Sequence, residues 1–129
     1  MDPFDVLDGH RYVRLITFRK NGEPVPTPVW FARVGRALYV VTGRRTGKAK
    51  RIRNNARVVI APCDFIGRQK GPDVRATARL TGQRADDPAD RALRRKYGWQ
   101  YGAFKFVEGL FGSSEDLVFL ELRAPGAEG

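Results

Sequence analysis

The sequence predicts a small, mainly β protein, a six-stranded antiparallel barrel with short helices in the connections. Segments rich in β-branched and aromatic residues recur along the chain, as expected for strands. Most of them are linked as hairpins, and helical patterns are confined to the connections. No internal repeat or low-complexity segment interrupts this order. The six expected strands are 12–18, 25–32, 38–42, 58–64, 74–80 and 117–122.

The first two strands are expected to form a hairpin around Arg19-Lys20-Asn21-Gly22. An Asn-Gly pair favours a tight turn because both residues tolerate positive φ. The returning strand carries Pro26 and Pro28, which cannot donate hydrogen bonds to a neighbouring strand. We therefore expect part of one edge of this strand to be unpaired, which leaves Thr27 and the nearby backbone free to meet a ligand. A merely protected edge would have the same prolines.

The third strand leads into a turn with two glycines, Gly43 and Gly47, and an expected helix over 47–54. Thr46 can cap this helix, because its side-chain oxygen can accept from a free backbone N–H of the first turn. A helix start offers unpaired donors and a partial positive charge, and both favour an anion. Lys48 lies in this first turn and opposes the helix dipole, so we expect it to face something negative.

Further cations surround this helix start, namely Arg44, Arg45, Lys50, Arg51 and Arg53. A phosphate placed here would meet backbone donors and several positive charges, although a solvated basic helix without a ligand would have the same residues. The segment is not a Walker A loop, because three residues rather than four separate Gly43 from Gly47, and Ala49 replaces the Mg²⁺-binding Ser or Thr. Nucleotide triphosphate hydrolysis is therefore not expected.

The length of 129 residues indicates one domain, 1–129, with 1–10 and 124–129 as peripheral tails. A net charge of +10 favours an anionic partner, whether nucleic acid, a membrane surface or a multiply charged small molecule. Cys63 and His10 are single, so we expect neither an internal disulfide nor a metal site. No apolar run approaches the roughly 20 residues that span a bilayer, and no secretory signal opens the chain. A cytoplasmic location is expected.

The second half contains a further helix that begins at Asp86-Asp87-Pro88 and ends before Gly98. Its expected apolar face consists of Ala89, Ala92, Leu93 and Tyr97. The aromatic-rich segment 99–111 could form another helix, and its aromatic residues favour a core or dimer contact over a ligand platform. His10 is expected to be a surface or capping residue.

Five features of the sequence occur together in the order found in a known family: the hairpin YVRLITFRKNGEPVPTPVWF, the strand LYVVTG, the helix TGKAKRIRNNARV, the segment APCD and the strand VRATARL. From about Tyr12 to Arg123 the chain resembles the split β-barrel flavin and deazaflavin proteins related to pyridoxamine 5'-phosphate oxidase. Within them it resembles most the B-type enzymes that use coenzyme F420. The resemblance implies the FMN-binding split barrel fold and a homodimer with cofactor sites at the subunit interface.

The resemblance also implies which residues hold the cofactor. Its phosphate would lie at the helix start, on Thr46, Gly47 and Lys48, with Arg51 and Arg53 nearby. Its ring would lie along the second strand, on Thr27, Pro28, Val29 and Trp30. Thr42 would contact the ribityl-phosphate region, and the ring would be approached by the loop Phe65, Ile66, Gly67 and Arg68. The excess positive charge suits F420, whose tail carries phosphate and several glutamates, better than FMN with its single phosphate.

The function implied is an F420-dependent oxidoreductase that transfers a hydride between the deazaflavin and an unidentified small organic substrate. Such an enzyme needs no nucleophile and no metal, in agreement with a sequence that has no Ser-His-Asp order and no Cys/His cluster. No catalytic residue is assigned. A proton donor could be water or one of the side chains suggested by chemistry alone, His10, Tyr97, Tyr101 and Lys105.

Three alternatives remain open at this point. One is an FMN-dependent oxidase or reductase on the same barrel, and another is a carrier that binds the cofactor without turnover. The third is a basic nucleic-acid-binding module, which the positive charge would suit. Neither a recognition helix nor a platform of alternating aromatic and basic residues supports this third reading.

Overall fold

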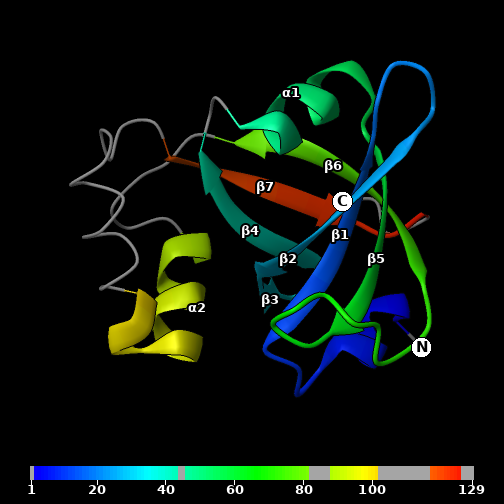
Figure 1. The fold of residues 1–129 in the computed structure, drawn as a ribbon. Coiled ribbons are helices and arrows are strands. Elements are labelled where there is room, and N and C mark those ends of the chain that lie inside the picture. Colours follow the sequence, from blue (N-terminus) through cyan, green and yellow to red (C-terminus); the bar gives the residue numbers. More distant parts are fainter. Residues whose placement is uncertain (1, 44–45, 82–87, 102–116, 126–129) are drawn as a thin grey trace.

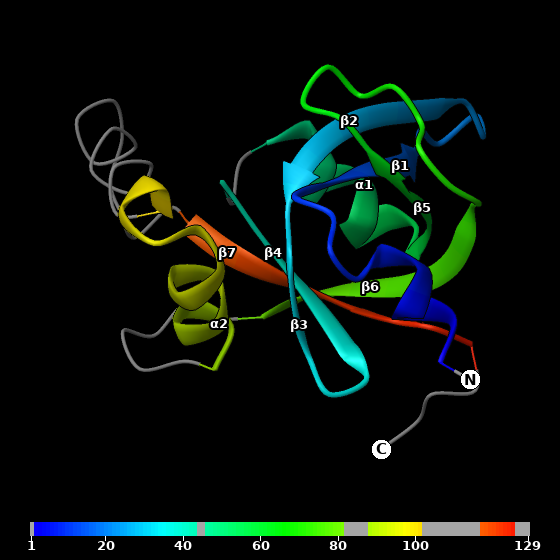
Figure 2. The ribbon, with the colours of Figure 1, turned by 90° about the horizontal axis from the view of Figure 1, so that it is seen from below.

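The computed structural model describes residues 2–43, 46–81, 88–101 and 117–125. One antiparallel sheet of seven strands curls into a half-open barrel, in the order β2-β1-β5-β6-β7-β4-β3 (Figure 1 and Figure 2). The strands are β1 (Tyr12–Phe18), β2 (Pro24–Trp30), β3 (Ala32–Val34), β4 (Ala37–Gly43), β5 (Arg57–Cys63), β6 (Val74–Thr81) and β7 (Leu117–Arg123). The described helices are η1 (Pro3–Leu7), α1 (Gly47–Asn54) and α2 (Pro88–Tyr97). The predicted mainly β, antiparallel split barrel is confirmed.

The strand count differs from the prediction, because the second expected strand, 25–32, is divided. β2 ends at Trp30, and Ala32–Val34 forms β3, which pairs with β4. Phe31 alone joins β2 to β3, although these two strands are the opposite edges of the sheet. At this corner, where β2 passes to β3 at Phe31, the residues are apolar and continue the strand pattern. No Gly or Asn indicates a break. Six strands were therefore predicted where the described part of the chain forms seven.

The β1–β2 hairpin pairs Phe18 with Pro24 at the turn and Tyr12 with Trp30 at the other end. In the turn, only Gly22 has positive φ, at 88°. Its N–H donates to the Arg19 carbonyl at 2.8 Å, while the Arg19 N–H donates to the Glu23 carbonyl at 2.9 Å. The loop is therefore one residue longer than a two-residue Asn-Gly turn.

Three prolines remove the hydrogen-bond donors from the free edge of β2. Pro24, Pro26 and Pro28 all belong to the ladder with β1, and alternate residues of an antiparallel strand point their N–H groups toward and away from the partner. Because proline has no N–H, these residues occupy the positions that point away from β1. β2 is an edge strand, as predicted, and its free edge cannot extend the sheet with a regular ladder.

Side chains from α1 and η1 pack into the core of the barrel together with side chains from the strands. Ile52 of α1 is buried in the same cluster as Phe4 and Leu7 of η1, and Figure 1 shows α1 and η1 at opposite ends of the barrel. Phe4 and Leu7 are fully buried, although residues 1–10 were expected to be a peripheral tail. Side chains three apart on a 3₁₀ turn lie on one face, and burying each contributes roughly 1.5–3 kcal/mol.

The N-terminal turn is also fixed by ion pairs to Arg33 of β3. The Arg33 guanidinium lies 3.0 Å from Asp2, 2.8 Å from Asp5 and 3.0 Å from Asp8. These carboxylates raise the pKa of Arg33 above its usual range. The first residues of the chain are thus part of the folded unit rather than an appendage.

The helix predicted over 86–97 is confirmed in its described part, and α2 packs against β3 and β4. The predicted apolar face is buried or half-buried, and it forms a second core cluster with Phe119 and Tyr101. Gly98 adopts a φ of 60° directly after the helix, as its predicted role in ending the helix requires. Asp86, Asp87 and most of the segment 99–111 lie outside the described residues.

A single buried carboxylate connects three strands on the outer face of the sheet. Glu121 of β7 accepts from the Tyr39 hydroxyl at 3.0 Å, from Arg79 Nε at 2.9 Å and from Arg123 Nε at 3.0 Å. The hydrogen bond from Arg79 is the largest cause that lowers the pKa of Glu121, to about 2. The carboxylate is therefore ionised in the folded protein at every pH at which the protein would normally be handled.

We expect Glu121→Gln to lower the free energy of unfolding by roughly 1.5–3 kcal/mol at neutral pH, because a charge-assisted network is lost. The folded pKa lies below the ordinary value, so the wild-type advantage exists above that value and is lost as pH falls toward the folded pKa. The difference between the proteins should therefore shrink from about pH 5 to about pH 3. Urea unfolding across this range measures it.

Glu23→Gln is the matched control, because Glu23 is exposed and its nearest cation, Arg19, lies 3.7 Å away. This variant should unfold like the wild type throughout. A Glu121→Gln difference that stays constant with pH would contradict the assignment of the acid response to this carboxylate.

Candidate functional site

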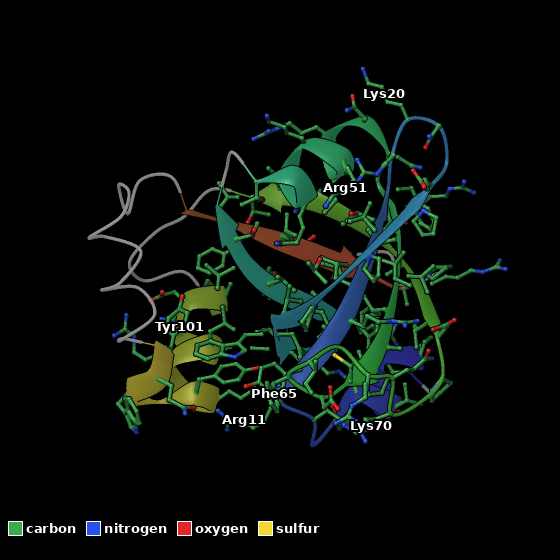
Figure 3. All side chains as sticks on the ribbon, in the orientation of Figure 1. Arg11, Lys20, Arg51, Phe65, Lys70 and Tyr101 are labelled. Atoms are coloured by element: carbon green, nitrogen blue, oxygen red, sulfur yellow. The ribbon has the colours of Figure 1, made fainter. Side chains whose placement is uncertain are left out.

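A cavity of about 380 Å³ lies in the split between the β1–β2 hairpin and β4. Its hairpin wall consists of Tyr12, Pro28, Val29 and Trp30, and its opposite wall of Val41, Thr42 and Gly43. Thr46 and Lys48 contribute from the start of α1, and Phe65 from the loop after β5. Figure 3 shows Arg51 beside α1 and Phe65 toward the opposite end of the barrel. The volume and the apolar walls with a few polar groups are typical of a small-molecule site.

The start of α1 is built as the sequence predicts. Thr46 Oγ1 accepts from the Ala49 N–H at 3.3 Å and donates to the Gly43 carbonyl at 2.9 Å. Its oxygen also lies 3.2 Å from Thr42 Oγ1, which ties the helix to the end of β4. Within the described part of the chain, the N–H groups of Gly47 and Lys48 have no acceptor. The first turn therefore keeps two donors for an anion.

Two cations are held together at this helix start. Arg51 turns back over the helix, where its Nε donates to Thr17 Oγ1 at 2.6 Å. A Cβ at Gly47 would lie 2.7 Å from Arg51 Nη1, so any larger residue there would displace this guanidinium. Burial lowers the pKa of half-buried Lys48, and the nearby Arg51 charge lowers it further.

No carboxylate in the described ranges forms an ion pair with Lys48 or Arg51. Burial, followed by the charge of Arg19, lowers the pKa of Arg51 as well. Holding like charges together in a partly desolvated place costs free energy unless an anion compensates them. The arrangement therefore indicates an anion-binding end of the cavity.

The structure brings about half of the predicted site residues to the cavity: Pro28, Val29, Trp30, Thr42, Thr46, Lys48 and Phe65. Gly47 and Arg51 lie directly beside them at the helix start. The other predicted residues do not line the cavity, namely Thr27, Arg53, Ile66, Gly67 and Arg68. Their role in cofactor binding stays a prediction.

The loop after β5 explains part of this difference. Arg68 turns back on Asp64, with 2.8 Å between Nε and Oδ2, and Gly67 packs beside the Pro28 ring. Thr27 points its hydroxyl toward the Leu15 carbonyl, 3.5 Å away. The side chains of Arg68 and Thr27 thus have partners outside the cavity lining.

Sequence reasoning missed three lining residues, Tyr12, Val41 and Gly43. Tyr12 could have been found from the hairpin, because the register that pairs Phe18 with Pro24 also places Tyr12 opposite Trp30. Val41 and Gly43 flank the predicted Thr42 on β4. Gly43 was predicted only as a turn residue, and no local signal indicated Val41.

The tyrosines considered as proton donors do not line the cavity. The Tyr97 hydroxyl is bonded to backbone groups, and the Tyr101 hydroxyl donates to Asp90 Oδ1 at 2.7 Å. His10 is half-buried and also does not line the cavity. Lys105 lies outside the described residues.

A family model described as pyridoxamine 5'-phosphate oxidase matches residues 4–124. The chain belongs to this family. No curated protein matches its sequence. Among the helices that the structure describes, none is long and apolar enough to cross a membrane.

Solved structures share the fold at low sequence identity. An F420 reductase is 20% identical with a TM-score of 0.63, and the match covers 95% of this chain and 93% of the reductase. The heme storage protein HutZ from Vibrio cholerae is 17% identical with a TM-score of 0.66, covering 97% and 87%. A pyridoxamine 5'-phosphate oxidase-related, FMN-binding protein from Nostoc punctiforme PCC 73102 is 17% identical with a TM-score of 0.58, covering 88% and 70%.

We expect inorganic phosphate to raise the melting temperature, by roughly 2–5 °C relative to chloride at equal ionic strength, because it binds the folded state alone. Lys48→Met should abolish this rise. Lys50→Met, an exposed lysine of the same helix, should retain it. Thermal melts of the three proteins measure the effect, and an equal rise in all three would contradict an anion site at Lys48.

Proposed function

We propose that the chain is a cytoplasmic F420-dependent oxidoreductase that transfers a hydride between the deazaflavin and a small organic substrate. The observation that carries the proposal is the pair Lys48 and Arg51, which lacks a described counter-charge and lies at one end of a largely apolar cavity. A ligand with an anionic group and a flat ring matches both parts of this site. When bound, the deazaflavin supplies or accepts the hydride.

The residues present fit such a cofactor. Thr46, Gly47 and Lys48 would hold its phosphate through backbone donors and the ammonium, and Arg51 would add charge at the same point. Pro28, Val29 and Trp30 would support the ring and exclude water from one side. Thr42 would offer its hydroxyl between these two regions.

F420 is favoured over FMN by charge and by one relative. The chain has a net charge of +10, which would attract a coenzyme tail with several carboxylates, and one similar structure is an F420 reductase. FMN remains the second candidate because another similar structure binds FMN. The heme storage relative is the reason to keep a non-catalytic carrier among the alternatives.

The proposal includes a homodimer whose second copy covers the open side of the cavity. Phe65 and Ile66 have 70% and 61% of their surface exposed, and they lie in the loop that packs beside Pro28. Pro24, Pro26 and Pro28 on the neighbouring edge strand are exposed too. Exposed apolar groups gathered beside a cavity are typical of an association surface.

Titration with F420 and with FMN, followed by absorbance and fluorescence, tests the cofactor. We expect F420 to bind more tightly, and Lys48→Ala to weaken binding about tenfold or more because a charge-assisted contact is lost. Lys50→Ala serves as control and should leave the affinity unchanged. Reduced F420 mixed with quinones, nitro compounds, enones or tetrapyrroles then tests turnover.

Tighter binding of FMN would favour the FMN enzyme, and binding of F420 without turnover of any substrate would favour a carrier. Affinity for a DNA duplex that falls steeply with salt, without affinity for either cofactor, would favour the nucleic-acid reading. Each of these results would contradict the proposed activity.

Sedimentation velocity tests the dimer. Ile66→Glu should shift the protein toward a monomer, because it places a charge in the proposed apolar contact. Val6→Glu is the control, since Val6 is also an exposed apolar residue but belongs to η1 rather than to this loop. An unchanged sedimentation coefficient for Ile66→Glu would exclude the loop from the interface.

A further inference from the structure

The last residue of α2 holds the corner where β2 passes to β3. The Phe31 N–H donates to the Tyr97 hydroxyl oxygen at 3.0 Å. The same hydroxyl lies 2.6 Å from the Arg11 carbonyl and 2.9 Å from the Phe31 carbonyl, so its proton can serve either acceptor. Burial raises the pKa of Tyr97 to about 12, and the phenol therefore keeps this proton throughout the neutral range.

The ring of Tyr97 contacts the same region. It stacks on Trp30 with 4.5 Å between ring centroids and 8° between the planes. The neighbouring Lys96 places its ammonium 3.3 Å from the centroid of the Phe31 ring. Two consecutive residues of α2 thus hold Phe31 through its backbone and its ring, and Trp30 through its ring.

The contacts lie where the chain passes directly from one wall of the cavity to the other. Phe31 follows Trp30 of the hairpin wall and precedes β3, which pairs with the β4 wall. Arg11 precedes Tyr12, which pairs with Trp30 across the hairpin. A rotation of the backbone at Phe31 would move one wall relative to the other, because no ladder joins the free edge of β2 to β4.

We propose that Tyr97 is a positioning residue that fixes the separation of the cavity walls and the orientation of the Trp30 ring. Its effect on cofactor affinity rests on the proposed function, whereas its effect on Trp30 does not. Tyr97 does not line the cavity, so it acts through the residues that it holds.

Tyr101 provides a matched control. It is a fully buried tyrosine just after the same helix, and its hydroxyl donates to Asp90 Oδ1 at 2.7 Å. This hydrogen bond joins Tyr101 to the first turn of α2 and involves neither Phe31 nor Arg11. A comparison with Tyr101→Phe therefore distinguishes a general loss of α2 packing from the specific loss of the Tyr97 contacts at Phe31.

The experiment uses a Trp99→Phe background. The chain has two tryptophans, and Trp99 is 80% exposed, so the substitution leaves Trp30 as the sole fluorescent indole. Tyr97→Phe, Tyr97→Leu and Tyr101→Phe are compared in this background. Acrylamide quenching of Trp30 is measured without ligand, and the dissociation constants of F420 and FMN are measured by titration well below each melting temperature.

We expect Tyr97→Phe to increase the quenching of Trp30 and to weaken binding of the preferred cofactor about tenfold, since the corner loses its hydroxyl contacts. Tyr97→Leu also loses the ring stack and should increase both effects. Tyr101→Phe should leave quenching and affinity at background values even where its melting temperature falls. If Tyr97→Leu does not fold, Tyr97→Phe carries the test, because it keeps the stacked ring.

Unchanged quenching in Tyr97→Phe and Tyr97→Leu would overturn the inference, and so would an equal increase in Tyr101→Phe. If the background protein binds neither cofactor, the proposed function fails on that result alone. The quenching series would still support or overturn the role of Tyr97 at the corner.

Discussion

The absence of backbone donors along one strand edge determines the shape of this molecule. Pro24, Pro26 and Pro28 occupy three of the four alternate positions of β2, so its free edge cannot pair with β4 in a regular ladder. The sheet curls until its two edges approach, and among the described strands no ladder joins these edges, which the chain connects through Phe31. The opening that remains between β2 and β4 is the cavity. The same prolines protect an exposed edge from pairing with other chains, so one sequence feature meets two requirements.

Positive charge is concentrated at one end of this cavity. α1 begins where β4 ends, and its first turn presents free N–H groups, Lys48 and the returning side chain of Arg51 at one end of the cavity. Partial burial of like charges destabilises the protein without ligand, while the Glu121 network and the buried side chains of η1 stabilise the barrel elsewhere. An anionic cofactor would offset the local cost, and it would stabilise the folded state by mass action. Function and stability are therefore coupled at the helix start.

Sequence patterns correctly predicted those features that depend on neighbouring residues within one helix or strand. The cap Thr46, the helix after it and the edge position of β2 all follow from residues within one element. The division of the second strand at Phe31 could not be predicted, because it depends on the pairing of β3 with a distant strand and no turn residue indicates it. The burial of Phe4 and Leu7 and the contacts of Tyr97 depend likewise on residues far along the chain. In the site, the charged helix start was predictable from spacing, whereas Val41 joins it only through the curvature of the sheet.

The most direct measurement is a crystal structure of the protein grown with F420. We expect the ring beside Pro28, Val29 and Trp30, and the phosphate at the N–H groups of Gly47 and Lys48. A structure in which side chains of this protein fill the split between β2 and β4, with the coenzyme bound elsewhere or absent, would contradict the assignment of this cavity as the cofactor site.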